Sequence, residues 1–149
     1  MPSALPFEVE FAHTDMGGVI FFGRYIELAH RAYEYLVRQQ LNLDWATWFD
    51  NPDWLVPVRA LTVDYLRPLR GGAAGEIQPR VEKIGRSSFT HSYTFLSQGN
   101  EAAIVRMTSV FVDRTTFRKI PIPPLVLKLL QENGRRRTVA ELGPGEQES

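Results

Sequence analysis

A long amphipathic segment over residues 23–40 is the feature that most constrains how this chain can fold. The charged face of the segment carries Glu27–Arg31 and Glu34–Arg38, which are spaced as i,i+4 ion pairs. The other face is a stripe of apolar residues at helical spacing, made up of Tyr25, Leu28, Ala29, Ala32 and Leu36. The sequence therefore predicts one long helix that must cover an apolar surface.

After this segment the chain changes to alternation of period two. Strands are predicted at residues 7–11, before the helix, and at residues 58–66, 76–82, 89–96 and 103–111, after it. Tight turns separate the later strands, and Gly99-Asn100 is typical of a hairpin. The few charges in residues 58–66 predict a strand that is covered on both faces.

Strands that follow one another without helices between them pair antiparallel. The predicted fold class is therefore α+β, with an antiparallel sheet of about five strands wrapped around one long central helix. A short helix over residues 125–130 should follow, ending near Asn133-Gly134. The length of 149 residues fits one domain. We expect that domain over residues 1–134 and a mobile C-terminal tail over residues 135–149.

Composition excludes several classes of protein. The chain has no cysteine, which rules out a disulfide framework, a thiol nucleophile and cysteine-ligated metal centres. Its 17 basic and 17 acidic residues cancel, whereas a general nucleic-acid binder normally carries a basic excess. The N-terminus lacks the features of a signal peptide, and no apolar run approaches the ~20 residues of a membrane span. We expect a soluble, cytoplasmic protein that needs no metal or cofactor and binds neither nucleic acid nor membrane.

A polar, glycine-rich loop before the long helix holds the most informative residues. Asp15 precedes Gly17 and Gly18, and an apolar stretch then leads into the helix. Glycines let a substrate approach the backbone, and the first helical turn offers unpaired N–H groups at the positive end of the helix dipole. An acyl oxygen could be polarised there, with Asp15 beside it as base or nucleophile. The plainer alternative is an Asx-turn in which the carboxylate only shapes the loop.

This loop resembles the active-site signature of the hotdog-fold acyl-CoA thioesterases of the 4-hydroxybenzoyl-CoA thioesterase family. The family pattern is an Asp, one or two variable residues, a Gly, apolar and often aromatic residues, and a Tyr in the following helix. The residues that fit it in order are Asp15, Gly18, Val19, Ile20, Phe21, Phe22 and Tyr25. The resemblance extends from about residue 7 to residue 130 and includes the strand order, residues 63–69 and residues 83–89.

The resemblance implies roles for the residues of the loop. The Asp15 carboxylate would attack the thioester carbonyl or activate a water molecule to do so. The backbone N–H groups of Phe22 and Gly23 would polarise that carbonyl, and Gly18 and Tyr25 would contact the substrate.

The family's other branch uses a catalytic Glu from the long helix of the partner subunit. This sequence keeps the Asp form, and Glu27 and Glu34 fall on the charged face of the predicted helix, which disfavours that arrangement.

Family members hold the CoA phosphates with a basic residue in the turn that corresponds to residues 85–88. Arg86, Ser87 and Ser88 would grip a phosphate through a guanidinium and two hydroxyls; an exposed turn arginine without a ligand is an equal alternative. Weaker candidates of the same kind are Arg118 and Lys119, and the basic cluster at residues 135–137 is better explained as a solvated tail.

For three further groups of residues, we consider both a structural and a functional role. His13 could orient the Asp15 carboxylate, although a structural role at a strand end is favoured. His91 alternates with apolar residues and is interpreted as a residue on the face of the sheet. The aromatic residues Trp45, Trp48 and Phe49 would line either the core or an acyl pocket.

The resemblance implies an acyl-CoA thioesterase that works as a homodimer or homotetramer, with CoA entering as part of the substrate. An aromatic acyl group is expected, because the sequence is most similar to cyanobacterial enzymes that hydrolyse 1,4-dihydroxy-2-naphthoyl-CoA in phylloquinone biosynthesis. The alternatives are a 4-hydroxybenzoyl-CoA or short-chain acyl-CoA thioesterase, or a non-catalytic module that binds an acyl-CoA or acyl-carrier protein. A dehydratase of the same fold is disfavoured, because Asp15 stands where those enzymes usually carry a His.

Overall fold

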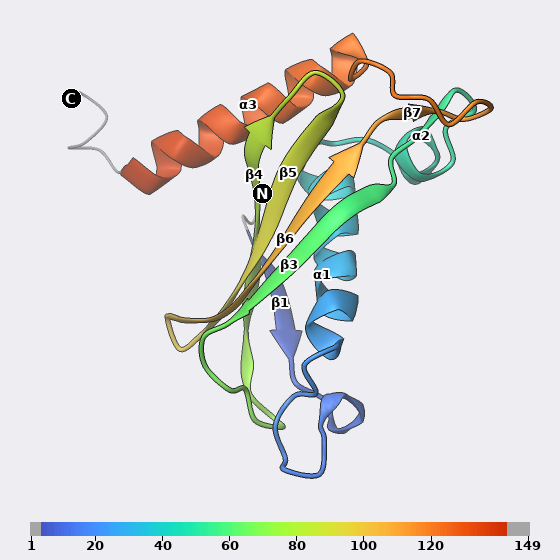
Figure 1. Ribbon diagram of the computed structural model, residues 1–149. Coiled ribbons are helices and arrows are strands. Elements are labelled where there is room, and N and C mark those ends of the chain that lie inside the picture. The colour runs from blue at the N-terminus through green and yellow to red at the C-terminus, as the bar shows by residue number, and fades with distance from the viewer. Residues whose placement is uncertain (1–3, 143–149) are drawn as a thin grey trace.

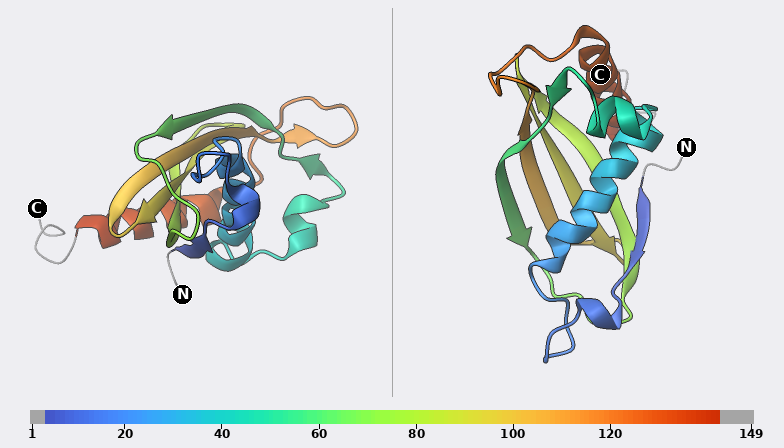
Figure 2. Two further views of the ribbon diagram at one scale, coloured as in Figure 1. Left: turned by 90° about the horizontal axis from the view of Figure 1, so that it is seen from below. Right: turned by 90° about the vertical axis from the view of Figure 1, so that its right-hand side faces the viewer.

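The computed structural model describes the backbone of residues 4–142 and the side chains as far as residue 135. Within this part of the chain, five antiparallel strands form one curved sheet in the order β1-β4-β5-β6-β3. They are β1 (Leu5–Glu8), β3 (Val58–Tyr65), β4 (Ala74–Ile84), β5 (Ser88–Ser97) and β6 (Asn100–Val110). The sheet wraps around one long helix, α1 (Arg24–Tyr35), which confirms the predicted α+β architecture (Figures 1 and 2).

Helix α1 buries the apolar stripe that the sequence predicted. It continues into a single π-helical turn, η2 (Leu36–Gln40), so the helical segment ends at the predicted residue. Ala29 and Ala32 are fully buried, and their small side chains let the helix lie close to the sheet. The sheet side of this core comes from alternating residues of β5 and β6, together with Phe111 just after β6; the strand residues are Phe89, His91, Tyr93, Phe95, Val105 and Met107.

The predicted hairpin between β5 and β6 is present, but its turn begins at Gln98, one residue before the predicted Gly99-Asn100. Ser97 pairs with Asn100, and the two central residues, Gln98 and Gly99, have φ angles of 53° and 76°. Two left-handed residues in succession match the right-handed twist of the flanking strands, which explains the short loop.

Several shorter elements differ from the prediction. The strand expected over residues 7–11 ends at Glu8, because the chain turns into a 3-10 helix, η1 (Phe11–His13). The region between α1 and β3 contains a short helix, α2 (Trp45–Phe49), and the two-residue strand β2 (Trp54–Leu55). Strand β2 pairs with β7 (Val112–Asp113) beyond the end of β6.

The C-terminal helix, α3 (Pro124–Leu142), runs past its predicted end near Asn133-Gly134 and packs against β4. A glycine inside a helix costs only about 1 kcal/mol, so Gly134 does not stop it. The domain boundary at residue 134 and the mobility of residues 135–149 stay predictions, since residues 143–149 lie outside the described part of the chain.

Strand β3 lies at the edge of the sheet and is largely exposed. The prediction that residues 58–66 are covered on both faces is therefore wrong for the single chain. The pairing of Leu61 with Met107 and of Val63 with Val105 places these side chains on the face turned toward α1. Leu61 is 37% exposed and Tyr65, on the same face, is 51% exposed. Apolar residues on an open sheet edge form a surface that is suited to pairing with another chain.

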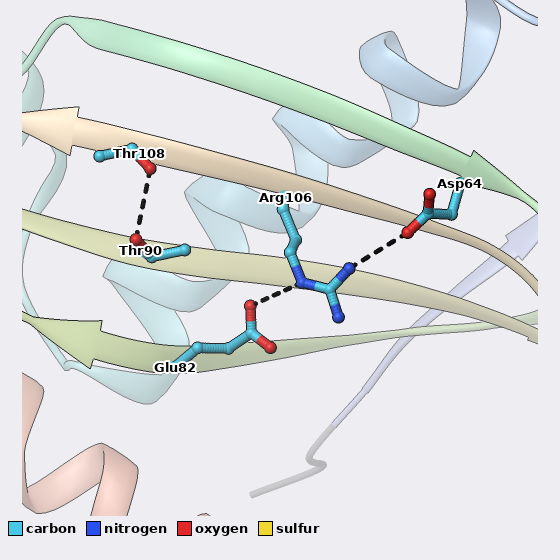
Figure 3. Close-up of polar contacts among 5 residues, drawn as sticks. All are labelled: Asp64, Glu82, Thr90, Arg106 and Thr108. Atoms are coloured by element: carbon cyan, nitrogen blue, oxygen red, sulfur yellow. Dashed lines mark hydrogen bonds and ion pairs between the residues drawn. The ribbon is translucent and has the colours of Figure 1, made fainter.

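The outer face of the sheet, away from α1, carries polar pairs instead (Figure 3). The Arg106 guanidinium donates from Nε to Glu82 at 3.0 Å and from Nη1 to Asp64 at 3.2 Å, linking β6 to β4 and β3. Thr90 and Thr108 form a hydroxyl pair at 3.3 Å between β5 and β6. Exposed ion pairs of this kind contribute roughly 0–1 kcal/mol each. Because the outer face is polar, an apolar binding site would lie on the inner side of the sheet or at one of its two ends.

Candidate active site

The loop before α1 is a small hairpin with a defined shape. Thr14 pairs with Ile20, and the Asp15 N–H donates to the carbonyl oxygen of Val19 at 2.9 Å. Gly18 closes the turn with a φ of 77°, a conformation that glycine adopts without the strain that a side chain would bring. Gly18 therefore shapes the loop that carries Asp15.

Backbone hydrogen bonds fasten this hairpin to the chain before β4. The Ile20 N–H donates to Leu69 at 2.7 Å, and the Gly71 N–H donates to Gly18 at 2.9 Å. The loop is thus held by its own backbone, so a side chain on it can be replaced without releasing the loop.

The Asp15 side chain is exposed and is held by one hydrogen bond. Its Oδ1 atom accepts from the Gly17 N–H at 2.8 Å, which is the Asx-turn considered above. Within the described residues, Oδ2 makes no hydrogen bond. The Asx-turn and a reactive carboxylate are therefore compatible, because the turn orients one oxygen and leaves the other free.

Among the described residues, backbone N–H groups without a backbone acceptor lie at the start of α1. Arg24 donates to Phe21 at 2.9 Å, whereas in the described part of the chain the N–H groups of Phe22 and Gly23 have no backbone acceptor. The Tyr65 hydroxyl donates to the carbonyl oxygen of Phe22 at 3.2 Å. In a trans peptide the N–H points opposite to the C=O, so this bond aims the Gly23 N–H away from Tyr65.

A cavity of about 270 Å³ lies beside the start of α1. Tyr25 and Tyr65 meet edge to face in its wall with ring centroids 5.5 Å apart, and burial raises the pKa of Tyr25 to about 12. The structure thus brings the predicted residues Phe22 and Tyr25 together. The lining of this cavity consists of Val19, Ile20, Phe22, Tyr25, Tyr65, Leu66, Arg67 and Pro68.

Sequence reasoning missed Tyr65 as a residue of this site. Its place at the end of a strand, inside the segment 63–69 that carries the resemblance, was the available signal.

The proposed CoA-binding turn lies at the other end of the sheet. The β4–β5 turn with Arg86 is far from the Asp15 loop in the single chain (Figure 1). Arg86 is exposed, and its carbonyl oxygen accepts from the Ile122 N–H at 2.8 Å. One chain alone therefore does not bring these two groups together. Ser87 in the same turn and Ser88 at the start of β5 are half-buried. Arg118 and Lys119 are exposed in the loop after β7.

A second cavity, of about 300 Å³, lies at the far end of α1. The aromatic segment contributes both to the core and to a pocket, since Trp48 is buried in the core and also lines this cavity with Phe49. Trp45 is 48% exposed and contacts Phe49 from outside. The complete lining is Tyr33, Trp48, Phe49, Leu55, Val56, Pro57 and Phe117.

The histidines near these sites have structural surroundings. His13 is buried in a structural role, but in η1 and not at the end of a strand, since its Nδ1 atom accepts from the N–H of Glu10, the residue before η1, at 3.0 Å. His91 lies on the inner face of the sheet, where burial lowers its pKa to about 3 and keeps it neutral.

The helix glutamates lie on the charged face as predicted. Glu34 pairs with Arg38 at 3.3 Å, but Glu27 pairs with Arg24 at 2.7 Å and not with the predicted Arg31. An i,i+3 partner on the first turn is as close along the helix surface as an i,i+4 partner.

No three His, Asp or Glu side chains gather within residues 4–135 in a way that could hold a metal ion. Among residues 4–142, no helix is both long and apolar enough to cross a membrane.

Comparisons with known proteins agree with this geometry. Residues 9–130 match the family model described as the thioesterase-like superfamily. The 1,4-dihydroxy-2-naphthoyl-CoA hydrolase of Thermosynechococcus vestitus is 29% identical over 133 residues, which cover 87% of this chain and 90% of the relative. The hydrolase of the same name from Nostoc punctiforme is 30% identical over 134 residues, covering 89% of each chain.

Solved structures show the same fold. The crystal structure of a 1,4-dihydroxy-2-naphthoyl-CoA thioesterase from Synechocystis superposes with a TM-score of 0.78 at 18% identity, covering 87% of this chain and 95% of that one. The family match and this likeness confirm the predicted hotdog fold.

Proposed function

This chain belongs to the thioesterase-like superfamily, and we propose that it is a thioester hydrolase that acts on an aromatic acyl-CoA, with 1,4-dihydroxy-2-naphthoyl-CoA as the first candidate substrate. The observation that carries the proposal is the loop from Asp15 to Tyr25. It carries a carboxylate with one free oxygen, followed by two N–H groups without a backbone acceptor, and its residues Val19, Ile20, Phe22 and Tyr25 line a cavity. The names of the relatives at 29–30% identity support this choice of acyl group.

In the proposed mechanism, the thioester carbonyl oxygen accepts hydrogen bonds from Phe22 and Gly23 at the positive end of α1. Asp15 Oδ2 then attacks the carbonyl carbon, the C–S bond breaks, and water hydrolyses the resulting anhydride. In the second version, Asp15 instead takes a proton from the water that attacks the carbonyl. Either route consumes one water molecule and yields the carboxylic acid and free CoA.

The site is completed by a second copy of the chain. The β3 edge exposes an apolar stripe on the inner face, and antiparallel pairing of two such edges about a two-fold axis would cover it. Tyr65 of one chain would then lie near Val58 of the partner subunit. A homodimer is thus the minimal assembly, and a homotetramer would contain two of these dimers.

This pairing joins parts that one chain keeps apart. Strand β3 has eight residues and spans roughly 27 Å, so the two cavities at its ends are too far apart to serve one acyl group. In the dimer, the cavity lined by Val56 and Pro57 of the partner would face the Asp15 loop. The partner's turn with Arg86, Ser87 and Ser88 would reach the same end and could hold the CoA phosphates.

The proposal is tested by thiol release from an acyl-CoA panel with wild type and Asp15→Asn. The panel contains 1,4-dihydroxy-2-naphthoyl-CoA, 4-hydroxybenzoyl-CoA, and one short and one long aliphatic acyl-CoA. Removing a nucleophile or general base should lower kcat by at least ~100-fold. Asp44→Asn is the matched control, because Asp44 is also an exposed aspartate whose carboxylate accepts one backbone N–H, from Thr47 at 2.8 Å.

Each of the other outcomes would contradict one part of the proposal. Equal rates for wild type and Asp15→Asn would remove Asp15 from the chemistry. An aliphatic preference would overturn the aromatic acyl group. Binding of CoA without turnover of any thioester would favour a non-catalytic binding module.

A further inference from the structure

A continuous path of hydrogen-bonded side chains crosses the core between α1 and the sheet. At its centre, His91 Nδ1 lies 2.6 Å from the Tyr93 hydroxyl and Nε2 lies 2.8 Å from Ser109 Oγ. Ser109 also bonds to the hydroxyl of Tyr33, which in turn accepts a hydrogen bond from Trp48 Nε1–H at 2.7 Å. The path therefore runs from Tyr93, deep in the sheet, to Tyr33 and Trp48 in the wall of the 300 Å³ cavity.

The protons on this path can be arranged in two directions. Neutral histidine carries one ring proton, and burial keeps His91 neutral by lowering its pKa to about 3. If that proton is on Nδ1, His91 donates to Tyr93, and the proton of the Tyr93 hydroxyl is left without an acceptor. Tyr93 is fully buried, so this arrangement costs about 1–3 kcal/mol.

The other direction moves the unpaired proton to the cavity, where a ligand or water can accept it. With the ring proton on Nε2, Tyr93 donates to His91, His91 donates to Ser109, and Ser109 donates to Tyr33. The Tyr33 oxygen then accepts from both Ser109 and Trp48, which uses its two lone pairs. The one proton left over belongs to the Tyr33 hydroxyl, at the end of the path that meets the cavity.

We propose that the Tyr33 hydroxyl donates this proton to an oxygen atom on the ring of the acyl group, which makes Tyr33 a specificity-determining residue for hydroxylated aromatic substrates. The inference rests on the proposed function and narrows its substrate class. Tyr33 and Trp48 are the polar side chains of the cavity lining, and the Trp48 N–H is already given to Tyr33. A volume of about 300 Å³ is at the lower end of the range for small-molecule pockets, roughly 300–1,000 Å³.

An unsubstituted ring in this cavity would leave the Tyr33 donor unpaired. Sites built to bond a substrate hydroxyl discriminate strongly against analogues that lack it. The sequence could not indicate this role, since the path joins residues from α1, α2, β5 and β6.

The test compares wild type and Tyr33→Phe on 1,4-dihydroxy-2-naphthoyl-CoA and on 2-naphthoyl-CoA, which lacks the ring hydroxyls. We expect Tyr33→Phe to lower kcat/KM at least 10-fold for the hydroxylated thioester and less than 2-fold for the unsubstituted one. An equal loss on both would show a merely structural role, and no loss on either would also overturn the inference. Tyr35→Phe, on the same helix and half-buried, should leave the ratio of the two substrates unchanged.

A second measurement does not depend on turnover. Nitrogen-15 NMR of the His91 ring should show the proton on Nε2, and a proton on Nδ1 would overturn the direction of the path. If wild type hydrolyses neither thioester, the proposed function fails on its own. Binding of 1-hydroxy-2-naphthoate and 2-naphthoate then decides the inference: wild type should prefer the hydroxylated acid and Tyr33→Phe should lose that preference, whereas identical preferences would refute it.

Discussion

The Tyr65 hydroxyl donates a hydrogen bond to the carbonyl oxygen of Phe22 at 3.2 Å, across 43 positions of sequence. This bond ties the exposed end of β3 to the start of α1. It also fixes the plane of the peptide that contains the Gly23 N–H, one of the two donors proposed to bind the thioester oxygen. Tyr65 is therefore a positioning residue in the proposed mechanism.

Tyr65→Phe should lower kcat for an aromatic acyl-CoA by about 3- to 10-fold, because a hydrogen bond of this kind contributes about 0.5–1.5 kcal/mol. KM should change less than 2-fold, since the ring that contacts Tyr25 and Phe22 is kept. Steady-state kinetics separate the two parameters. An unchanged kcat would show that the orientation of this peptide is set without Tyr65.

Arg86→Ala should raise KM for the CoA thioester about 5- to 10-fold and leave kcat nearly unchanged, because the guanidinium is proposed to contact a phosphate remote from the reacting bond. The same acyl group on pantetheine, which lacks the nucleotide phosphates, should be hydrolysed equally by both proteins. Lys128→Ala, an exposed cation on α3, is the control. A KM increase of the same size for both thioesters would contradict a phosphate contact.

Leu61→Asp should weaken self-association at least 100-fold. The substitution places a charge in the apolar stripe of β3, which the proposed dimer buries. Sedimentation equilibrium measures the change, and thioesterase activity should fall in parallel because each site needs two chains. Leu125→Asp, at an equally apolar but more exposed position on α3, should remain dimeric. A monomeric wild type would refute the proposed assembly.

Acid should destabilise the fold through His91. Burial lowers the pKa of His91 from 6.5 to about 3, so between these values the unfolded chain binds a proton that the folded chain does not. The free energy of unfolding therefore falls as pH falls below 6.5, by up to about 1.4 kcal/mol per pH unit, and this loss ends near pH 3. Urea unfolding at pH 7.5 and 5.5 should show a loss about 1.4 kcal/mol larger for wild type than for His91→Gln. Equal losses would contradict a neutral buried His91.

Local patterns predicted the parts of the fold that depend on local interactions. The stripe of α1 and the hairpin after β5 depend on spacing and turn chemistry within a few residues, and both formed as expected. The exposure of β3 could not be predicted in this way, because its low charge reflects a surface that the single chain leaves open. The end of α3 was misplaced because one glycine, Gly134, was given more weight than its modest cost in a helix deserves.

The candidate site was predictable only in part, for the same reason. The Asp15 loop is continuous in sequence, so its glycines and the following helix indicated it directly. Tyr65 and Tyr33 are hydrogen-bonded to residues that lie 43 and 15 positions away, Phe22 and Trp48. No spacing rule links such pairs before the sheet and helix are assembled.

The separation of the Asp15 loop and the Tyr33 cavity at opposite ends of α1 has a consequence for mixtures of subunits. If each site takes Asp15 from one chain and Tyr33 from the other, an Asp15→Asn chain and a Tyr33→Phe chain complement each other. Their heterodimer contains one doubly altered site and one site with both original side chains. After equal mixing and random exchange, about a quarter of all sites would regain full activity on the hydroxylated thioester. Sites contained within single chains would give only the average of the two variants.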